Sequence, residues 1–385
     1  MYLRDMAQAT NSLPKLAAVP EAGENPAFLQ SQLISYLGNK RTLLPFIGLA
    51  LRKVQAQLGI KRLRTLDLFS GTGVVARYLK RYSSVLHVND LETYSRITNE
   101  CYLTNRSAVN RRNLAEVVAW LEAELERKSK PGLLCELYAA KNEAAITPED
   151  RVFYTRRNAI YLDTARVAIS LLPPDLQPYF LAPLVAEASV HVNTSGVFKG
   201  FFKNPDGVGQ FGGTGRNALK RILGEIKLSL PLFSNFETEY RIHQQDANAL
   251  VSTLPELDLA YFDPPYNQHP YGSNYFMLNL LAEYRCPQEM SKVSGIPADW
   301  NRSKYNQRAA AAETLFAAVA GCPSKFVLIS YNSEGFIPPG QFKASLAKLG
   351  QVTICEAPYN TFRGCRNLRN RPLHVTEFLY LLRKS

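Results

Sequence analysis

One short segment of the chain combines residue types that suit chemistry on an aromatic amine. The apolar run Leu257–Phe262 leads directly into Asp263-Pro264-Pro265-Tyr266. The amine of a nucleobase is a poor nucleophile, because its lone pair is delocalised into the ring. The Asp263 carboxylate and the Pro264 carbonyl can accept its N–H bonds and so localise that lone pair, while the two prolines stiffen the turn. Tyr266 offers a face on which an extruded base can stack, so the segment predicts an active-site turn.

A second segment has the spacing of a nucleotide-binding turn. Gly71, Gly73 and Ala76 fit the pattern G-x-G-x-x-A, and Asp90 ends the next predicted strand. Glycines let a ligand approach the backbone closely, and the acid can bind two ribose hydroxyls. The pattern fits NAD, FAD or S-adenosylmethionine (SAM) almost equally. Another match at 207–212 follows no predicted strand, and we interpret it as part of a loop.

The elements around these segments predict a parallel sheet. Arg62–Phe69 is predicted to be a strand, Val74–Tyr82 a helix and Val85–Val88 a second strand, which together make a βαβ unit. Asp263 then follows another strand at its carboxyl end, where doubly wound folds place their ligands. The later strands are predicted at Thr238–His243, Leu257–Phe262, Phe326–Ser330 and Val375–Leu382.

Between the second and third predicted strands the pattern becomes helical. Arg111–Lys128, Tyr154–Leu172 and Tyr179–Val192 show helical spacing and precede the glycine-rich stretch Gly196–Gly215. About 190 residues separate the first strand from the one before the Asp-Pro-Pro-Tyr turn, whereas three βα units need only about 90. We therefore predict an α/β fold, a doubly wound, Rossmann-like sheet with a mainly helical insert. The predicted parts are a loosely attached lead-in at 1–30, the first half of the sheet domain at 31–110, the insert at 111–236 and the second half of the sheet domain at 237–385.

Composition narrows the classes of protein that remain. Lysine and arginine total 45 against 33 acidic residues, and this net charge of +12 favours a polyanionic partner. The longest apolar run near the N-terminus, Leu43–Leu51, is too short to span a bilayer and no secretory signal is recognisable, so we expect an intracellular protein without a membrane partner. The six cysteines include no Cys-x-x-Cys pair and do not cluster with the histidines, so we expect no metal. An enzyme or a nucleic-acid binder remains.

Four motifs occur in a fixed order along the chain: Tyr36–Lys40, Asp67–Gly73, Asp90 and Asp263–Tyr266. In this order the chain resembles the SAM-dependent N6-adenine-specific DNA methyltransferases of the Dam/FokI-type (alpha) group. In that group a long insert before the Asp-Pro-Pro-Tyr motif is the target-recognition domain. The resemblance extends over roughly residues 31–382. One departure is Asn39, which stands where Dam has a glycine, and it leaves the role of Asn39 open.

The resemblance implies a specific reaction and specific partners. The enzyme would flip an adenine out of double-stranded DNA and transfer the methyl group of SAM to its N6 atom, without a metal. It would be the modification enzyme of a restriction–modification system, with a cognate restriction endonuclease as a further partner, or an orphan methylase. Its expected location is the cytoplasm of a prokaryotic cell.

The resemblance also assigns roles to individual residues. Asp263, Pro264, Pro265 and Tyr266 would be catalytic, and Asp90 would bind the ribose of SAM. The complete set expected at the cofactor is Tyr36, Lys40, Asp67, Phe69, Gly71, Gly73, Asp90 and Asp263.

Two basic segments are candidates for contact with DNA. The glycine-rich stretch, continued to Arg221, mixes phenylalanines with basic residues, a combination that can grip nucleic acid. A second segment near the C-terminus has no acidic residue and suits phosphate contact. The candidates in the two segments are Lys199, Lys203 and Arg216, and Arg363, Arg366 and Arg369.

Two alternatives stay open. One is a SAM-dependent RNA adenine methyltransferase, against which the long insert is the main argument. The other is a catalytically idle SAM-binding module that only docks on DNA, which the intact Asp-Pro-Pro-Tyr motif disfavours. Methyltransferases that act on cytosine N4 or on protein amides usually have serine or asparagine in place of Asp263, which argues against both.

Overall fold

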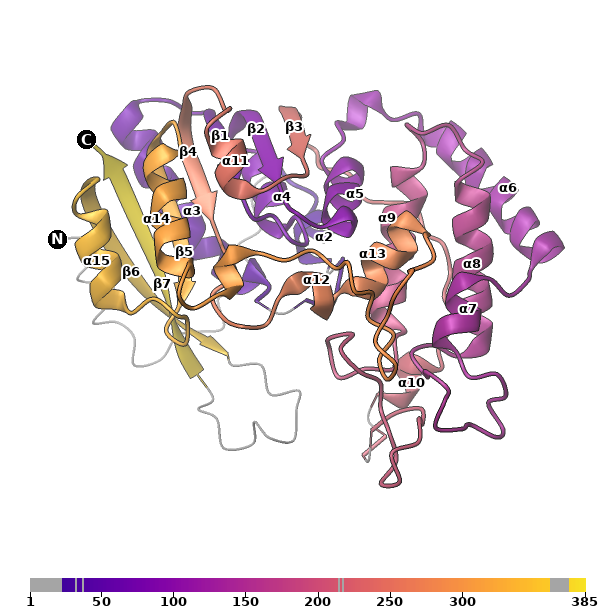
Figure 1. The fold of residues 1–385 in the computed structure, drawn as a ribbon. Helices are drawn as coiled ribbons and strands as arrows, with labels where there is room; N and C mark the ends of the chain where they lie inside the picture. Colours follow the sequence, from indigo (N-terminus) through magenta and orange to yellow (C-terminus); the bar gives the residue numbers. More distant parts are fainter. Residues whose placement is uncertain (1–22, 32, 37, 214, 217, 361–373) are drawn as a thin grey trace.

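The computed structural model describes residues 23–385 except 32, 37, 214, 217 and 361–373 (Figure 1). Its strands are β1 (Leu63–Asp67), β2 (Ser83–Asn89), β3 (Glu239–His243), β4 (Leu257–Phe262), β5 (Ser324–Asn332), β6 (Gly350–Asn360) and β7 (His374–Lys384). They form one seven-stranded sheet in the order β3-β2-β1-β4-β5-β7-β6. The first five strands are parallel, and β7 runs antiparallel to β5 and β6. The doubly wound sheet predicted from the sequence is confirmed.

The register of β1 against β4 brings the two chemical segments together. Asp67, the last residue of β1, pairs with Tyr261 of β4. Because β4 ends one residue later, at Phe262, the next residue is Asp263. The glycine turn after β1 and the Asp-Pro-Pro-Tyr turn after β4 therefore lie side by side at the carboxyl edge of the sheet.

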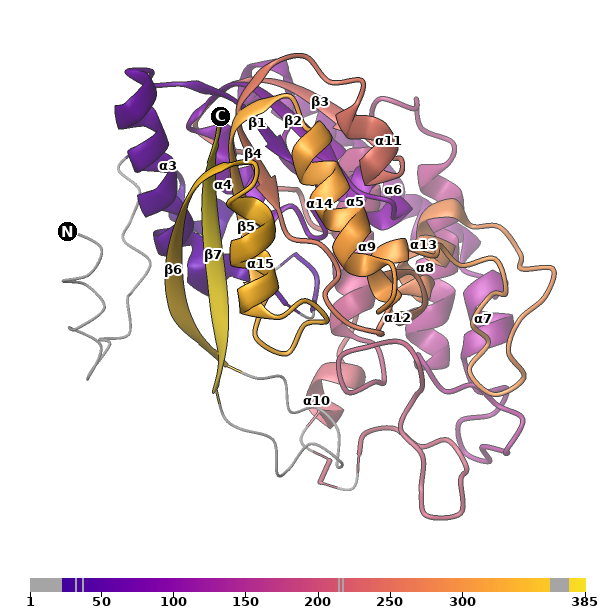
Figure 2. The same ribbon diagram turned by 60° about the vertical axis from the view of Figure 1, so that its left-hand side comes forward.

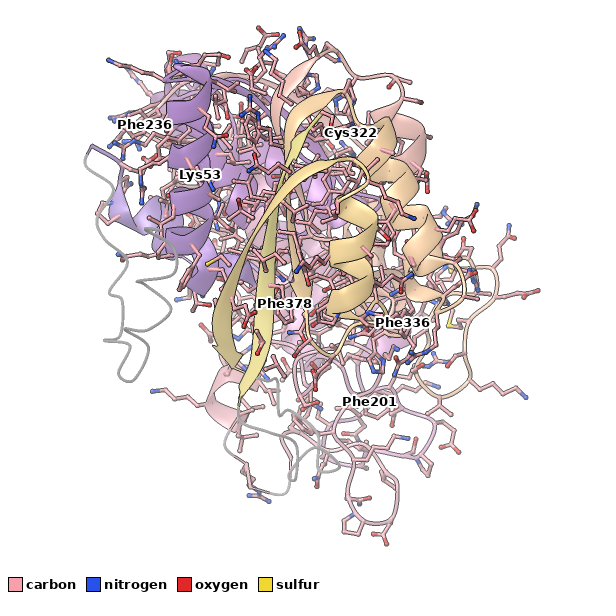
Figure 3. The ribbon with its side chains drawn as sticks, turned by 90° about the vertical axis from the view of Figure 1, so that its left-hand side faces the viewer. Lys53, Phe201, Phe236, Cys322, Phe336 and Phe378 are labelled. Atoms are coloured by element: carbon pink, nitrogen blue, oxygen red, sulfur yellow. The ribbon has the colours of Figure 1, made fainter. Side chains whose placement is uncertain are left out.

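Alternating side chains of the strands build a core on each face of the sheet. In β4, Leu259 and Tyr261 contribute to one core, and Ala260 and Phe262 contribute to the other. Figure 3 shows the helices in two layers on opposite sides of β6 and β7. The layers consist of α3 (Leu44–Leu58) and α4 (Val74–Lys80) on the first face, and α11 (Ala247–Val251), α14 (Ala311–Gly321) and α15 (Pro339–Leu346) on the second.

A third core lies among the helices beside the sheet (Figures 1 and 2). Its helices are α5 (Thr93–Tyr102), α6 (Arg111–Lys128), α7 (Leu133–Tyr138), α8 (Arg156–Ile169), α9 (Pro178–Val190) and α13 (Phe276–Glu283). Tyr94 and Ile97 of α5 and Met277 and Leu281 of α13 are buried in the same cluster as the helices of the predicted insert. The predicted insert therefore shares its core with two helices that the prediction assigned to the sheet domain.

Short elements complete the described chain: the helices α10 (Leu219–Ile222) and α12 (Tyr271–Asn274), and the 3-10 turns η1 (Lys40–Leu43), η2 (Arg106–Ala108) and η3 (Lys304–Asn306). In the described part of the chain, no helix has the length and apolar character needed to cross a bilayer.

The sequence predicted six of the seven strands and several helices, but it did not predict α5, α7 or α11–α15. The bounds of α6 and β4 agree with the prediction to the residue. Helix α8 begins two residues later than predicted, because the Thr155 side chain accepts a hydrogen bond from Asn158 N and caps the helix. Strand β6 was not predicted. It is an edge strand whose one neighbour in the sheet is β7.

The expectation of a loosely attached lead-in does not hold for residues 23–30. Helix α2 (Pro26–Gln30) buries Phe28 completely, and the Arg77 guanidinium lies 5.5 Å from the centre of that ring. Glu24 accepts hydrogen bonds from Ser234 Oγ (2.5 Å) and from Asn235 N (2.8 Å). Residues 1–22, the rest of the predicted lead-in, lie outside the described residues.

Candidate active site

A pocket that opens to solvent lies at the carboxyl ends of β1, β2, β3 and β4. Eight residues predicted from the sequence line it: Tyr36, Lys40, Asp67, Phe69, Gly71, Asp90, Asp263 and Pro265. Three others lie close to it without lining it, namely Gly73, Pro264 and Tyr266. The structure therefore brings the motifs of the sheet domain into one place.

The glycine turn is shaped by backbone conformations that other residues rarely adopt. Gly71 has a φ of +54° and Gly73 a φ of +73°. A Cβ atom on Gly73 would lie 2.6 Å from Asn99 Oδ1, and one on Gly71 would lie 3.1 Å from Tyr36. Gly71 N also donates a 2.7 Å hydrogen bond to Asp90 Oδ2. Both glycines are thus required by the turn itself, and Asp90 holds the turn in place.

Asp67 is the least satisfied carboxylate of the pocket. It is 1% exposed, and neither of its carboxylate oxygens has a hydrogen-bond partner among the described residues. Burial raises its pKa well above the ordinary value, and the neighbouring Asp263 and Asp90 raise the pKa further, while weak contacts from the Ala76 N–H and the Ser70 side chain lower it. An unpaired carboxylate in a pocket is suited to bind a cationic group of a ligand.

Two further acidic residues, Asp90 and Glu92, lie just after the end of β2. Asp90 accepts hydrogen bonds from Gly71 N and, through Oδ1, from Glu92 N (3.0 Å), and burial raises its pKa. Glu92 also lines the pocket, where its Oε2 accepts hydrogen bonds from Asn279 and Asn301. Burial raises the pKa of Glu92 to about 7. The sequence prediction missed Glu92, although its place two residues after Asp90 could have suggested it.

The buried Lys40 and the partly exposed Asp263 form an ion pair at the pocket. The distance from Lys40 Nζ to Asp263 Oδ1 is 2.9 Å, and the lysine side chain is 4% exposed. Burial raises the pKa of Asp263 to about 6, against the opposing effect of the lysine cation. Asn39 Oδ1 accepts a hydrogen bond from Arg41 N and caps η1, the turn that presents Lys40. This contact gives Asn39 the structural role that the sequence left open.

A third charged residue joins this pair from the far end of the chain. Glu377 of β7 lies with Oε1 3.4 Å from Lys40 Nζ, and its side chain is 1% exposed. The sequence prediction missed Glu377, because a glutamate inside an alternating strand is indistinguishable from a solvent-facing one. Burial alone would lower the pKa of Lys40, but Asp263 and Glu377 together raise it well above its usual value, so the lysine stays charged.

Aromatic side chains line the rest of the pocket. The Tyr36 ring stacks on Tyr271 (centroid distance 5.0 Å) and on Tyr275 (4.6 Å). The Phe69 ring packs edge-on against Tyr305 at 5.0 Å. Tyr271 and Tyr305 were not predicted as site residues, since each precedes or follows a loop rather than a strand.

Tyr266 lies beside the pocket and is half-buried. Its carbonyl accepts a hydrogen bond from Phe336 N (2.9 Å), and its ring packs edge-on against Tyr331. Asn306 Nδ2 donates to Asn267 O at 2.7 Å and so fixes the chain just after the turn. Figure 3 labels Phe336, which marks this region.

The predicted DNA contacts lie away from the pocket, on the glycine-rich stretch. Lys199, Lys203 and Arg216 are exposed, and Lys203 Nζ lies 5.1 Å from the centre of the Phe201 ring. Phe198 is buried in the helical core, so it packs and is not available to stack on a base. Figure 3 labels Phe201 on the stretch that projects below the sheet. The second predicted group, Arg363, Arg366 and Arg369, lies outside the described residues.

The Asn193 side chain organises the glycine-rich stretch. Asn193 Nδ2 donates to Val152 O (2.7 Å) and Gln210 O (2.8 Å), and Oδ1 accepts from Gly212 N (2.9 Å). Within the described chain, no group of three or more His, Cys, Asp or Glu residues is arranged to hold a metal ion.

Comparisons with known proteins agree with this geometry. Residues 36–314 match the model of the D12 class N6 adenine-specific DNA methyltransferases. The chain is 26% identical over 327 residues to the type II methyltransferase M.NlaIII of Neisseria lactamica, covering 83% of this chain and 90% of that protein. It is 25% identical over 345 residues to M.CviAII of Paramecium bursaria Chlorella virus 1, covering 86% of this chain and 93% of that protein. It is 26% identical over 329 residues to M.FokI of Planomicrobium okeanokoites, where 83% of this chain spans 48% of that protein, or about half its length.

Proposed function

Because the chain belongs to the D12 class N6 adenine-specific DNA methyltransferase family, we propose that it transfers a methyl group from SAM to N6 of an adenine extruded from duplex DNA. Its enzyme class is adenine-specific DNA methyltransferase, and the family is generally SAM-dependent. We further propose SAM as the methyl donor, an adenine extruded from the duplex as the acceptor, and specific residues for each.

The donor set of the pocket fits SAM. Asp67 has two buried carboxylate oxygens without partners, and these suit the ammonium group of an amino acid. Asp90 and Glu92 offer carboxylate oxygens for ribose hydroxyls, and Phe69 offers a ring beside a purine. The close approach that Gly71 allows suits the backbone contact that such a ligand needs. When bound, SAM supplies a methyl group activated by a sulfonium.

The ion pair between Lys40 and Asp263 is the observation on which the reaction rests. Lys40 holds Oδ1 of Asp263 at 2.9 Å, which leaves Oδ2 to accept a hydrogen bond from the adenine amine. The Pro264 carbonyl can accept the second N–H bond, and Tyr266 can stack on the base. A direct transfer then depends on positioning and electrostatics more than on a strong base.

Recognition of DNA is assigned to the helical insert at 111–236 and to the two basic segments. Lys199, Lys203 and Arg216 are exposed on the glycine-rich stretch, and the net charge of +12 favours a polyanion. The arginines at 363, 366 and 369 are assigned to phosphates on the sequence argument alone.

The relatives named type II methyltransferases support a role as the modification enzyme of a restriction–modification system, for which a cognate endonuclease would be the partner. A DNA substrate in a prokaryotic cell would place the enzyme in the cytoplasm.

The test is transfer of isotope-labelled methyl groups from SAM to defined nucleic acids, followed by digestion and separation of the nucleosides. We expect label in N6-methyl-2′-deoxyadenosine from duplex DNA, and its loss when Asp263→Ala replaces the parent enzyme. Label in RNA alone, or none from the folded parent with duplexes of diverse sequence, would overturn the proposal.

A further inference from the structure

We propose that Glu377 is a positioning residue for methyl transfer. It holds the Lys40 ammonium against Asp263, and its negative charge partly offsets the electrostatic effect of that ammonium on the Asp263 carboxylate. This role rests on the proposed function. Glu377 lies outside the Tyr36–Lys40 and Asp263–Tyr266 motifs, on another strand. Glu377 lies on β7, whereas Lys40 belongs to η1 and Asp263 follows β4.

The sheet itself fixes the Glu377 carboxylate. Asn332 of β5 pairs directly with Glu377 in the antiparallel register, and Asn332 Nδ2 donates to Oε2 at 3.1 Å. Ser330, two residues earlier on the same strand, donates through Oγ to Oε1 at 2.7 Å. Each carboxylate oxygen therefore has its own neutral donor from β5, and the side chain is 1% exposed. Such a carboxylate is a rigid acceptor whose charge no partner on β5 neutralises.

Lys40 is the cation that Glu377 meets. An ammonium has three N–H bonds, and three acceptors surround this one: Gly38 O at 3.2 Å, Asp263 Oδ1 at 2.9 Å and Glu377 Oε1 at 3.4 Å. Because the lysine side chain is 4% exposed, water cannot easily replace any of them. Glu377 and Gly38 thus set the direction in which the third N–H bond meets Asp263.

The two charges next to Asp263 act in opposite directions. After burial, the largest influence on the pKa of Asp263 is Lys40, which lowers it, and Glu377 raises it. A carboxylate of higher pKa is a stronger hydrogen-bond acceptor for the substrate amine. The titratable and charged groups that face Asp263 are Lys40 from η1, Asp67 from β1, Tyr261 from β4, Tyr271 from α12 and Glu377 from β7.

Only Lys40 among these five groups is cationic, and burial raises the pKa of both tyrosines so that they stay neutral. If the charge of Glu377 is removed, less opposes the effect by which Lys40 lowers the pKa of Asp263. The pKa of Asp263 should fall.

The experiment compares single-turnover methyl transfer to duplex DNA as a function of pH, with saturating SAM, for the parent and Glu377→Gln. We expect the acid limb of the rate profile to move to lower pH by about one unit. The plateau rate should fall by about tenfold, because Asp263 becomes a weaker and less well-aimed acceptor. The KM for DNA should stay within about twofold, since Glu377 is 1% exposed and does not line the pocket.

Two further variants make the result decisive. Glu377→Asp keeps the charge one methylene further from Lys40, so its acid limb should lie between those of the parent and Glu377→Gln. Glu356→Gln removes the same charge from an exposed position on the adjacent strand β6, and it should leave the profile unchanged.

An acid limb of folded Glu377→Gln that coincides with the parent's would overturn the inference and leave Glu377 a purely structural residue. If Glu377→Gln does not fold, a limb of Glu377→Asp that coincides with the parent's has the same force. An inactive parent would instead contradict the proposed function, so the two failures are distinguishable.

Discussion

Two buried carboxylates, one in the helical region and one in the sheet region, differ in the number of hydrogen bonds that they accept. In the helical region, Asp163 of α8 accepts hydrogen bonds from three backbone N–H groups, those of Gly132 (3.0 Å), Leu134 (2.8 Å) and Cys135 (2.8 Å). It also accepts one from Tyr284 Oη at 2.8 Å. In the sheet region, Asp67 is as deeply buried and has no partner among the described residues.

The two carboxylates differ in how fully the protein satisfies them with hydrogen bonds. Asp163 ties the start of α7 to α8, and its hydrogen bonds compensate for the loss of water. Asp67 makes no comparable set of hydrogen bonds, and under the proposed function a bound ligand completes it. Asp263 stands between these extremes, since Lys40 pairs with one of its two carboxylate oxygens.

The largest effect is expected from Asp263→Ala. The substrate amine then loses its principal acceptor, and the rate of methyl transfer should fall by at least about 10³-fold. Single-turnover assays on duplex DNA measure this rate, and thermal unfolding checks that the variant is folded. Near-parental turnover by the folded variant would remove Asp263 from the chemistry.

The paired variants Asp67→Asn and Asp163→Asn should change different properties. Asp67→Asn loses only the weak contacts from the Ala76 N–H and the Ser70 side chain, so its stability should be unchanged or raised, while SAM affinity falls by about tenfold or more. In Asp163→Asn, an amide with only one acceptor oxygen replaces a carboxylate that accepts several hydrogen bonds. This variant should lose about 1–3 kcal/mol of stability and keep its SAM affinity.

Calorimetric titration with SAM and thermal unfolding measure both properties of each variant. If Asp67→Asn is the less stable variant and binds SAM normally, the contrast between the two regions fails.

The pH dependence of the parent should show the ionisation of Asp263. The pKa of this carboxyl is raised to about 6, and the ionised form is the one that accepts the amine. The single-turnover rate should therefore fall about tenfold for each pH unit below about 6. Since the Lys40 cation lowers the pKa of Asp263, Lys40→Met should move the acid limb to higher pH. A limb at the same pH in this variant would show that the lysine does not act on Asp263.

The smallest effects are expected on the glycine-rich stretch. Lys199→Ala and Lys203→Ala should weaken DNA binding, and each genuine phosphate contact should add about 0.9 to the slope of log affinity against log salt. Lys325→Ala is the control, because Lys325 is exposed at the start of β5, at the end of the parallel strands away from the pocket, where it pairs with Glu256 and Asp258. Slopes equal to the parent's in both loop variants would place DNA recognition elsewhere.

The sequence was sufficient to predict the motifs whose defining residues lie close together along the chain. A strand followed directly by Asp-Pro-Pro-Tyr, and a glycine turn between strand and helix, have signatures within about ten residues. The bounds of β4 and the pocket position of Asp263 follow from such signatures. The bounds of α6 also agree, since an Asn110 cap starts it and a basic last turn ends it.

What the sequence could not predict depends on register between distant strands. Glu377 meets Lys40 only because β7 inserts antiparallel between β5 and β6, and no local pattern specifies that order. For the same reason β6, an edge strand with a mixed exposed and half-buried pattern, was missed. The shared helical core was hidden as well, because α13 follows the Asp-Pro-Pro-Tyr turn yet packs with α8 and α9.

The most direct measurement of the central claim is long-read methylation sequencing of DNA from cells that express the parent chain or Asp263→Ala. We predict N6-methyladenine at one recurring sequence motif in cells with the parent, and its absence with the variant at equal protein level. Unmodified adenines with the folded parent, or equal modification with Asp263→Ala, would contradict the claim that this pocket methylates adenine in DNA.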